Sequence, residues 1–128
     1  MTREQGSVTV IVAALVLTVL VLSLGVAEIG RVLVARSHAR TAADAAALAV
    51  AQELVLPTGH DPVDVASAYA AWNGAAVQTC SCATGASDTT VTVTIGVSGL
   101  LLFPGDFSVI AAARAVVDVP PPSSPPTP

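Results

Sequence analysis

Residues 8–27, VTVIVAALVLTVLVLSLGVA, decide the fold of this 128-residue chain. They lie in a run of 23 residues without a charged side chain, bounded by Glu4 and Glu28. About 20 such residues cross the roughly 30 Å hydrocarbon core of a bilayer as a helix. Thirteen of the twenty are Leu, Ile or Val, and together they favour insertion by about 4–8 kcal/mol. The segment is therefore predicted to be a membrane-spanning helix.

Two other interpretations of this run compete with that one. Gly25-Val26-Ala27 has the small residues of a signal-peptide cleavage site, although the apolar region of a signal peptide is usually only about 7–15 residues long. A buried core helix would carry a polar face and would need a larger domain around it than 128 residues can supply.

The arginines give conflicting evidence on orientation. Arg3 precedes the apolar run, whereas Arg31, Arg36 and Arg40 follow it. Counting only Lys and Arg, the positive-inside rule places the C-terminal flank in the cytoplasm. The two cysteines in the C-terminal part and the short N-terminal segment favour the opposite orientation. Charge alone leaves both orientations open.

Helical signals continue beyond the apolar run through residues 28–56. No proline occurs before residue 57, so one rod about 70 Å long is predicted from about residue 7 to residue 54. Arg36, Arg40 and Asp44 recur every four residues and share one face. Alanines gather on the opposite side: Ala42, Ala45, Ala46 and Ala49. Such a face lets another helix approach closely, although alanine is also simply the best helix former.

A short second helix is predicted to follow at the start of a small α+β domain. Asp61 suits an N-cap and Pro62 the first helical position, while Asn73-Gly74 suits the C-terminal end. Tyr69 and Trp72 share one face of this helix, and we expect them to anchor a small core.

Two segments with alternating apolar residues, 90–97 and 107–119, predict an antiparallel β-hairpin. Six prolines among residues 120–128 predict a solvated, disordered tail. The predicted fold class is α+β, with a long N-terminal membrane-spanning helix continuing into an Ala-rich helix. The predicted divisions are a cytoplasmic N-terminus (1–7), a transmembrane helix (8–27), a helical extension (28–56), a small α+β domain (57–119) and the tail (120–128).

The Cys80 and Cys82 pair is a candidate disulfide. In an extended strand their Cα atoms would lie about 6.5–7 Å apart, at or beyond the limit for a bridge, whereas a turn around Ser81 would permit one. An intrachain bridge, an intermolecular bridge and free thiols are all compatible with the sequence. Two thiols and a distant His60 fall short of the four ligands that zinc prefers.

No motif in the chain indicates an enzyme. His60, Asp64 and Ser67 could be combined into a triad on paper, but no nucleophile-elbow motif surrounds the serine. The glycines are dispersed and form no phosphate-binding loop. A net charge of −4 with scattered acids argues against nucleic acid as a partner. We therefore expect no cofactor, no metal and no small-molecule substrate.

Two segments carry a family resemblance: GSVTV at residues 6–10 and RSHARTAADAAALAVA at residues 36–51, in which TAADAAALA is the more specific part. With the cysteine-bearing region and Ala113-Arg114-Ala115, they make the chain similar to the TadE/TadG-like proteins of Flp-type (tight-adherence) pilus assembly. The likeness is to short, alanine-rich members of the actinobacterial type. The matching motif, expected to serve helix packing, comprises Arg36, Arg40, Thr41, Ala42, Ala43, Asp44, Ala45, Ala46, Leu48 and Ala49.

The resemblance implies a pseudopilin-like, non-enzymatic protein of the cytoplasmic (inner) membrane, with a single span and an extracytoplasmic C-terminal domain. It would be a minor pilin-like component of a pilus or secretion apparatus. Its implied partners are membrane lipid and other pilin-like or secretion-apparatus helices.

The resemblance also implies a processing site. Pilin-like proteins are cut after a glycine that precedes the apolar helix, which maps to Gly6 before Ser7. The glutamate that commonly follows five residues into the mature chain is replaced here by Ile11. The alternatives are a membrane-tethered cell-envelope binding module unrelated to pili, and a small secreted protein released after Ala27.

Overall fold

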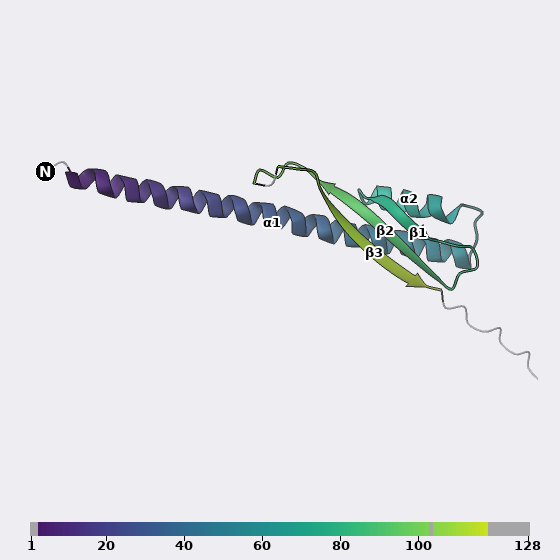
Figure 1. Ribbon diagram of the computed structural model, residues 1–128. Helices are drawn as coiled ribbons and strands as arrows, with labels where there is room; N and C mark the ends of the chain where they lie inside the picture. Colours follow the sequence, from purple (N-terminus) through teal and green to yellow (C-terminus); the bar gives the residue numbers. More distant parts are fainter. Residues whose placement is uncertain (1–2, 103, 118–128) are drawn as a thin grey trace, which may run out of the picture.

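The computed structural model describes residues 3–102 and 104–117 (Figure 1). Its elements, in chain order, are α1 (Arg3–Val55), α2 (Pro62–Trp72), β1 (Ala76–Ser81), β2 (Asp88–Val97) and β3 (Phe107–Val116). The strands form one antiparallel sheet in the order β1-β2-β3. The predicted α+β class is confirmed. The proline-rich segment 120–128 lies outside the described residues.

α1 is one continuous helix of 53 residues, about 80 Å long at 1.5 Å per residue. No proline interrupts it, so its backbone has no forced kink. The hydroxyls of Thr18 and Ser23 donate to the carbonyls of Ala14 and Val19, each at 2.8 Å. These two polar side chains therefore remain satisfied in apolar surroundings. The single rod predicted from the sequence is confirmed.

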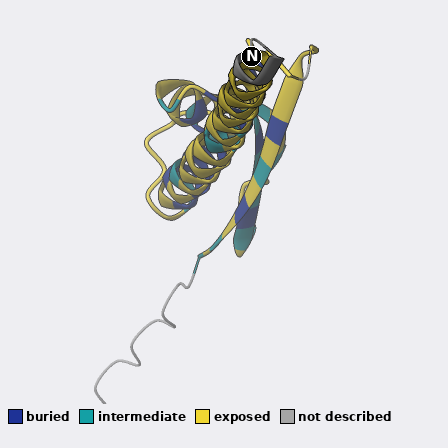
Figure 2. Cartoon of the chain, turned by 90° about the vertical axis from the view of Figure 1, so that its left-hand side faces the viewer, coloured by how far each residue is buried: buried dark blue, intermediate teal, exposed yellow. Residues whose placement is uncertain are grey.

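The two halves of α1 have different surroundings. Almost all side chains from residue 6 to residue 27 are exposed, whereas buried positions begin at Glu28 and become frequent beyond residue 39. Figure 1 shows the first half of α1 projecting from the rest of the molecule, and Figure 2 shows it coloured as exposed. We call residues 8–27 the apolar segment, and the described residues from 28 onward the head.

The head has a thin core because the residues at its contacts are small. Both helices pack on one face of the sheet (Figure 1). Fully or nearly buried alanines line the facing sides of α1 and α2, and Val91 and Val93 of β2 close the core from the sheet. Since alanine has no side chain beyond Cβ, the elements approach closely.

α2 begins and ends where the sequence predicts. The Asp61 carboxylate accepts a hydrogen bond from the Val63 backbone N–H at 2.7 Å, which satisfies one of the free donors at the helix start. Asn73 is the C-cap, and Gly74 follows with a φ of 72°, a conformation that favours glycine.

The expectation that Tyr69 and Trp72 anchor the core is wrong. Tyr69 is 37% exposed and Trp72 is 77% exposed. The residues that α2 buries are Ala66 and Ala70. Alanine contacts bring the helices too close for an indole or a phenol to fit between them. The two rings therefore lie at the edge of the helix pair.

β2 and β3 form the predicted hairpin, with an unbroken register from the Asp88–Val116 pair to the Val97–Phe107 pair. β1 was not predicted, because its sequence AVQTCS does not alternate regularly. The register shifts between Val77 and Thr79. This bulge lets Val77 and Cys80 both pack against the core despite their odd spacing.

Candidate functional site

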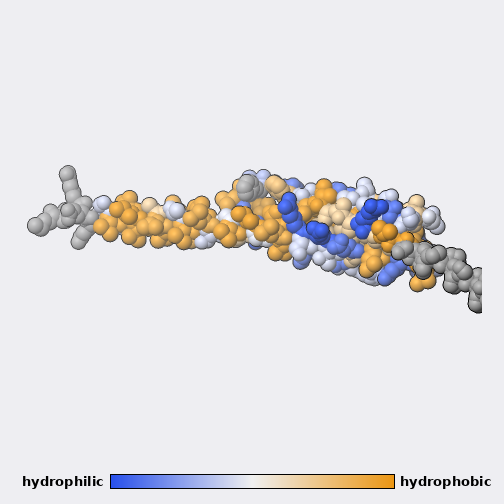
Figure 3. All heavy atoms as spheres, turned by 90° about the horizontal axis from the view of Figure 1, so that it is seen from below, coloured by the Kyte–Doolittle hydropathy of each residue, from blue (hydrophilic) through white to orange (hydrophobic). Residues whose placement is uncertain are grey.

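The apolar segment is the largest exposed apolar surface of the described residues. Its Leu, Ile and Val side chains are exposed, and Figure 3 shows apolar side chains along the face of the helix that is turned to the viewer. Among the described residues, α1 is the one helix long and apolar enough to cross a membrane. Exposed apolar surfaces of this size are typical of protein–protein or membrane interaction sites.

Two side chains of α1, just beyond the apolar segment, hold the loop between β2 and β3. Glu28 is 6% exposed, and its Oε1 accepts hydrogen bonds from the backbone N–H groups of Leu101 and Leu102, the latter at 2.8 Å. Arg31 donates to the Gly99 carbonyl at 3.0 Å. The loop between β2 and β3 is therefore held at the junction of head and apolar segment. The sequence singled out Glu28 only as the end of the uncharged run.

Most alanines of the family motif face the interior of the head. Ala42, Ala43 and Ala46 are fully buried and Ala49 nearly so. The close helix approach that this face permits is made to α2 of the same chain, which leaves these alanines unavailable to a partner helix. The exposed members of the motif are Arg36, Arg40, Thr41, Asp44 and Leu48, and Ala45 is half-buried.

Gly6 and Ser7 lie on the exposed surface of α1, within its first turns. A Cβ added at Gly6 would meet no atom within 4 Å. Packing therefore does not require a glycine at this position.

Cys80 and Cys82 form a disulfide in the structure, with Cα atoms 5.3 Å apart, inside the usual range for a bridge. The pair lies at the end of β1, half-buried against the core. The buried Thr89 hydroxyl donates to Cys82 Sγ at 3.5 Å. The bridge joins residues two apart, so it fixes the local backbone rather than connecting distant elements.

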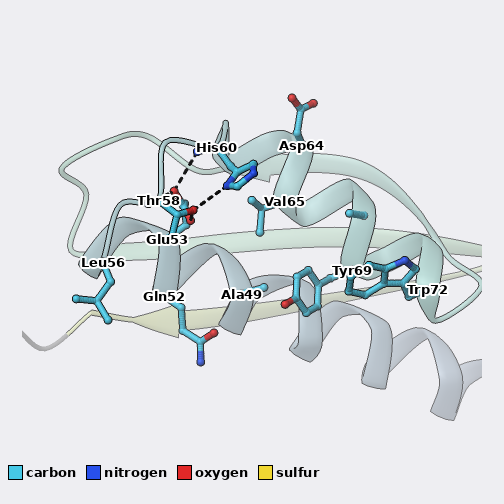
Figure 4. Close-up of a pocket in the computed structure, with 11 residues that line it drawn as sticks. Ala49, Gln52, Glu53, Leu56, Thr58, His60, Asp64, Val65, Tyr69 and Trp72 are labelled. Carbon is cyan, nitrogen blue, oxygen red and sulfur yellow. Dashed lines mark hydrogen bonds between the residues drawn. The ribbon is translucent and has the colours of Figure 1, made fainter.

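A carboxylate that the sequence did not single out, Glu53, organises the turn after α1 (Figure 4). Its Oε1 accepts from the backbone N–H groups of Thr58, Gly59 and His60 at 2.7, 3.1 and 3.2 Å, and its Oε2 accepts from Thr58 Oγ1 at 2.7 Å. The Thr58 side-chain hydrogen bond and then these backbone bonds hold the pKa of Glu53 below its ordinary value. The only sequence signal for the role of Glu53 was its position near the predicted end of a helix.

The hydrogen bonds around Thr58 are those of a structural turn. Thr58 Oγ1 also lies 2.7 Å from His60 Nδ1. Because the threonine proton goes to Glu53, His60 Nδ1 must be the donor to the threonine oxygen. The histidine therefore cannot take the threonine proton through this nitrogen. Among the described residues no hydrogen bond joins Ser67 to His60 or Asp64, and no cluster of three metal-binding side chains occurs.

Beside this turn, α1 and α2 enclose a cavity of about 720 Å³. We call it the aromatic groove; its lining includes Gln52, Leu56, Val65, Ala68, Tyr69 and Trp72. The rings of Tyr69 and Trp72 contact each other, with centroids 4.9 Å apart and planes inclined by 55°. Figure 4 shows both rings at one end of the cavity and Leu56 at the other.

Residues 6–53 match the protein family described as "Putative Flp pilus-assembly TadE/G-like". The resemblance seen in the sequence is confirmed over these residues. The TadE/G-like region coincides with α1, so it includes both the apolar segment and the alanines buried in the head. No curated protein and no solved structure matches the chain. The match covers 48 of the 128 residues of the chain.

Proposed function

We propose that this chain is a non-enzymatic, single-pass protein of the cytoplasmic membrane that serves as a minor pilin-like assembly component. One observation carries the proposal: the TadE/G-like match covers a single helix whose first half is exposed and apolar and whose second half is the backbone of the head. A helix of this kind places a small domain at a fixed height above a membrane or along a fibre.

The partners we propose are membrane lipid and the helices of other pilin-like or secretion-apparatus proteins. Because the head's own α2 and sheet cover most of the alanine face, a partner helix would contact the apolar segment. Its Leu, Ile and Val side chains are exposed on every side, so they can pack against lipid and protein alike.

We propose that the head lies outside the cytoplasm. The Cys80–Cys82 bridge supports this orientation, because disulfides persist in oxidising compartments. This orientation disagrees with the positive-inside rule, which would place Arg31, Arg36 and Arg40 in the cytoplasm.

Thiol labelling in intact cells tests the orientation. In a Cys80→Ser, Cys82→Ser background, we expect Ser108→Cys, on the exposed surface of β3, to react with a membrane-impermeant maleimide. The control Ser7→Cys lies on the other side of the apolar segment and is kept in a chain cut after Gly6. It should react only after lysis. The reverse pattern would place the head in the cytoplasm and support the arginine count.

N-terminal sequencing of the protein from its native cells tests processing. We propose cleavage after Gly6, which yields a chain that begins at Ser7. A chain that begins at Glu28 would support the secreted alternative, and one that begins at Met1 or Thr2 an uncleaved anchor.

Deletion of the gene tests the pilus role itself. We expect loss of Flp-type surface fibres in electron micrographs, with recovery when the wild-type chain is expressed. Normal fibres in the deletion strain would remove the assembly role and would favour a membrane-tethered binding module.

A further inference from the structure

We propose that the loop between β2 and β3, described at residues 98–102 and 104–106, binds the lipid surface beside the apolar segment. This contact rests on the proposed function, in which residues 8–27 span the bilayer. It gives the head a lipid contact of its own, in addition to the helix that anchors it.

Three hydrogen bonds place the loop just beyond the apolar segment. Glu28 Oε1 accepts from the backbone N–H groups of Leu101 and Leu102, and Arg31 donates to the Gly99 carbonyl at 3.0 Å. Figure 1 shows the loop at the end of the sheet that faces the projecting half of α1. The loop therefore lies at the level of residues 28–31 along the helix.

That level falls in the headgroup layer of a bilayer. The twenty residues 8–27 extend about 30 Å, which is the thickness of the hydrocarbon core. Each headgroup layer adds about 5–8 Å. Glu28 and Arg31 follow the segment by one and four residues, so they lie about 1.5–6 Å beyond the hydrocarbon edge when α1 is upright. A tilt of α1 towards the loop brings the loop deeper.

The loop exposes two leucines at this level. Leu101 is 77% exposed and Leu102 is 47% exposed, whereas Leu100 is buried in the head. Leu100 thus attaches the loop to the head while the next two side chains remain free for a partner. Residues 96–105 carry no charge. Neighbouring exposed apolar side chains of this kind are typical of membrane or protein contacts.

Apolar side chains connect the loop to the apolar segment. Phe107, at the start of β3, is exposed and lines a cavity of about 150 Å³ together with Glu28 and Val32 of α1. Leu24 and Val21 lie four and seven residues before Glu28, so they share its face of the helix, and both are exposed. Lipid that packs against this face of the apolar segment therefore meets the loop next.

The backbone of the loop is prepared for surroundings poor in water. An unpaired N–H or carbonyl group is costly away from water. Glu28 accepts from two of the loop's N–H groups, and Arg31 donates to one of its carbonyls. Pro104 has no N–H group to satisfy. The loop can therefore turn its leucines towards lipid without leaving these backbone groups unpaired.

The charge beside the loop favours lipid over an apolar protein surface. Arg31 is exposed and lies at the depth of the lipid phosphates. A guanidinium group pairs well with phosphate oxygens, whereas an apolar protein surface offers it no acceptor. Leucines below and an arginine beside them match the boundary between acyl chains and headgroups.

Fluorescence quenching by brominated lipid tests the contact on the full chain in phosphatidylcholine vesicles. In a Trp72→Phe background, Leu101→Trp places the single indole of the protein on the loop. Its emission should fall by about half when the acyl chains carry bromine, because an indole in the interface touches the upper part of those chains.

Two control positions make the result specific. Leu17→Trp reports on the apolar segment, and Val116→Trp reports on the other end of the β2–β3 hairpin, about 30 Å along β3. Quenching at Leu17→Trp without quenching at Leu101→Trp would overturn the loop contact and leave the membrane span intact. Quenching at neither position would overturn the span, and the loop contact with it. Equal quenching at Val116→Trp and Leu101→Trp would overturn the assignment to the loop.

Removing the leucines provides a second readout. With Phe107→Trp as the reporter in the same background, Leu101→Gln combined with Leu102→Gln should reduce quenching about two-fold, because amide side chains avoid the acyl chains. The substitutions retain both backbone N–H groups and add no charge beside Glu28. The control Leu101→Ile with Leu102→Ile should preserve the quenching. Unchanged quenching in the glutamine variant would overturn the role of the leucines.

Discussion

At the residue scale, Glu28 is the side chain that links the apolar segment to the head. Its carboxylate is buried, with Oε1 accepting two backbone N–H groups and Oε2 without a partner among the described residues. Burying a carboxylate is costly unless it is hydrogen-bonded. Glu28 therefore determines where the loop between β2 and β3 attaches to α1.

Replacing Glu28 with alanine should release this loop. The N–H groups of Leu101 and Leu102 would lose their acceptor, at a cost of about 1–3 kcal/mol. Hydrogen exchange of these two amides should therefore become about 5- to 150-fold faster. Glu28→Gln retains an acceptor oxygen and should preserve most of the protection. Unchanged exchange in Glu28→Ala would show that the loop is held by other contacts.

Glu53 should make the turn after α1 sensitive to acid. Its pKa in the folded chain lies below the ordinary value of 4.5, so the carboxylate stabilises the fold fully above that pH. The contribution is lost as the pH falls through the lowered pKa. The wild type should therefore melt above Glu53→Gln at neutral pH, and the difference should shrink below pH 4.5. A difference that persists in acid would exclude the carboxylate charge as its source.

At the scale of elements, α1 performs two tasks with two kinds of surface. Its first half is apolar on all sides, as expected for a helix in lipid. Its second half buries alanines against α2 and the sheet while Arg36, Arg40 and Asp44 remain exposed. Because the helix is unbroken, it fixes the position of the head relative to the apolar segment.

Enlarging a buried alanine on α1 should separate the packed elements. Ala46 is fully buried between them, so Ala46→Leu should destabilise the head by about 1–3 kcal/mol. The control Leu48→Ala, on the exposed face two residues away, should change stability by no more than about 0.5 kcal/mol. Urea unfolding followed by Trp72 fluorescence gives both values. Equal stability of the two variants would contradict the packing seen in the head.

At the scale of the whole molecule, position along α1 should decide what an exposed leucine does. Leu17 in the apolar segment and Leu48 in the head are 64% and 58% exposed, so exposure alone does not distinguish them. The difference arises from the surroundings that each half of the helix is proposed to occupy.

An arginine at each of these positions tests the division. Leu17→Arg places a charge near the centre of the proposed span, at a cost of about 2.5–3.5 kcal/mol, and should shift the protein from the carbonate-resistant membrane fraction towards the soluble one. Leu48→Arg should leave the membrane fraction unchanged. Soluble wild-type protein, with its first forty residues present, would contradict membrane anchoring altogether.

Much of the architecture could be predicted from local signals. Hydropathy and the absence of proline predicted α1. The ends of α2 were marked by Asp61, Pro62 and Gly74. Strict alternation of apolar residues predicted β2 and β3. β1 could not be predicted because its bulge hides the alternation. Glu53 could not be assigned to its turn, because its partners are set by how the chain turns after α1.

The sequence by itself determined the apolar segment, the continuous helix and the family likeness, because each depends on residues close together along the chain. Only the tertiary structure decided that the alanine face is buried within the same chain, that Tyr69 and Trp72 border a groove, and that Glu28 holds a loop more than seventy residues away. These outcomes depend on how closely two helices and a sheet can approach. That distance is set by the sizes of side chains that meet only in the folded head.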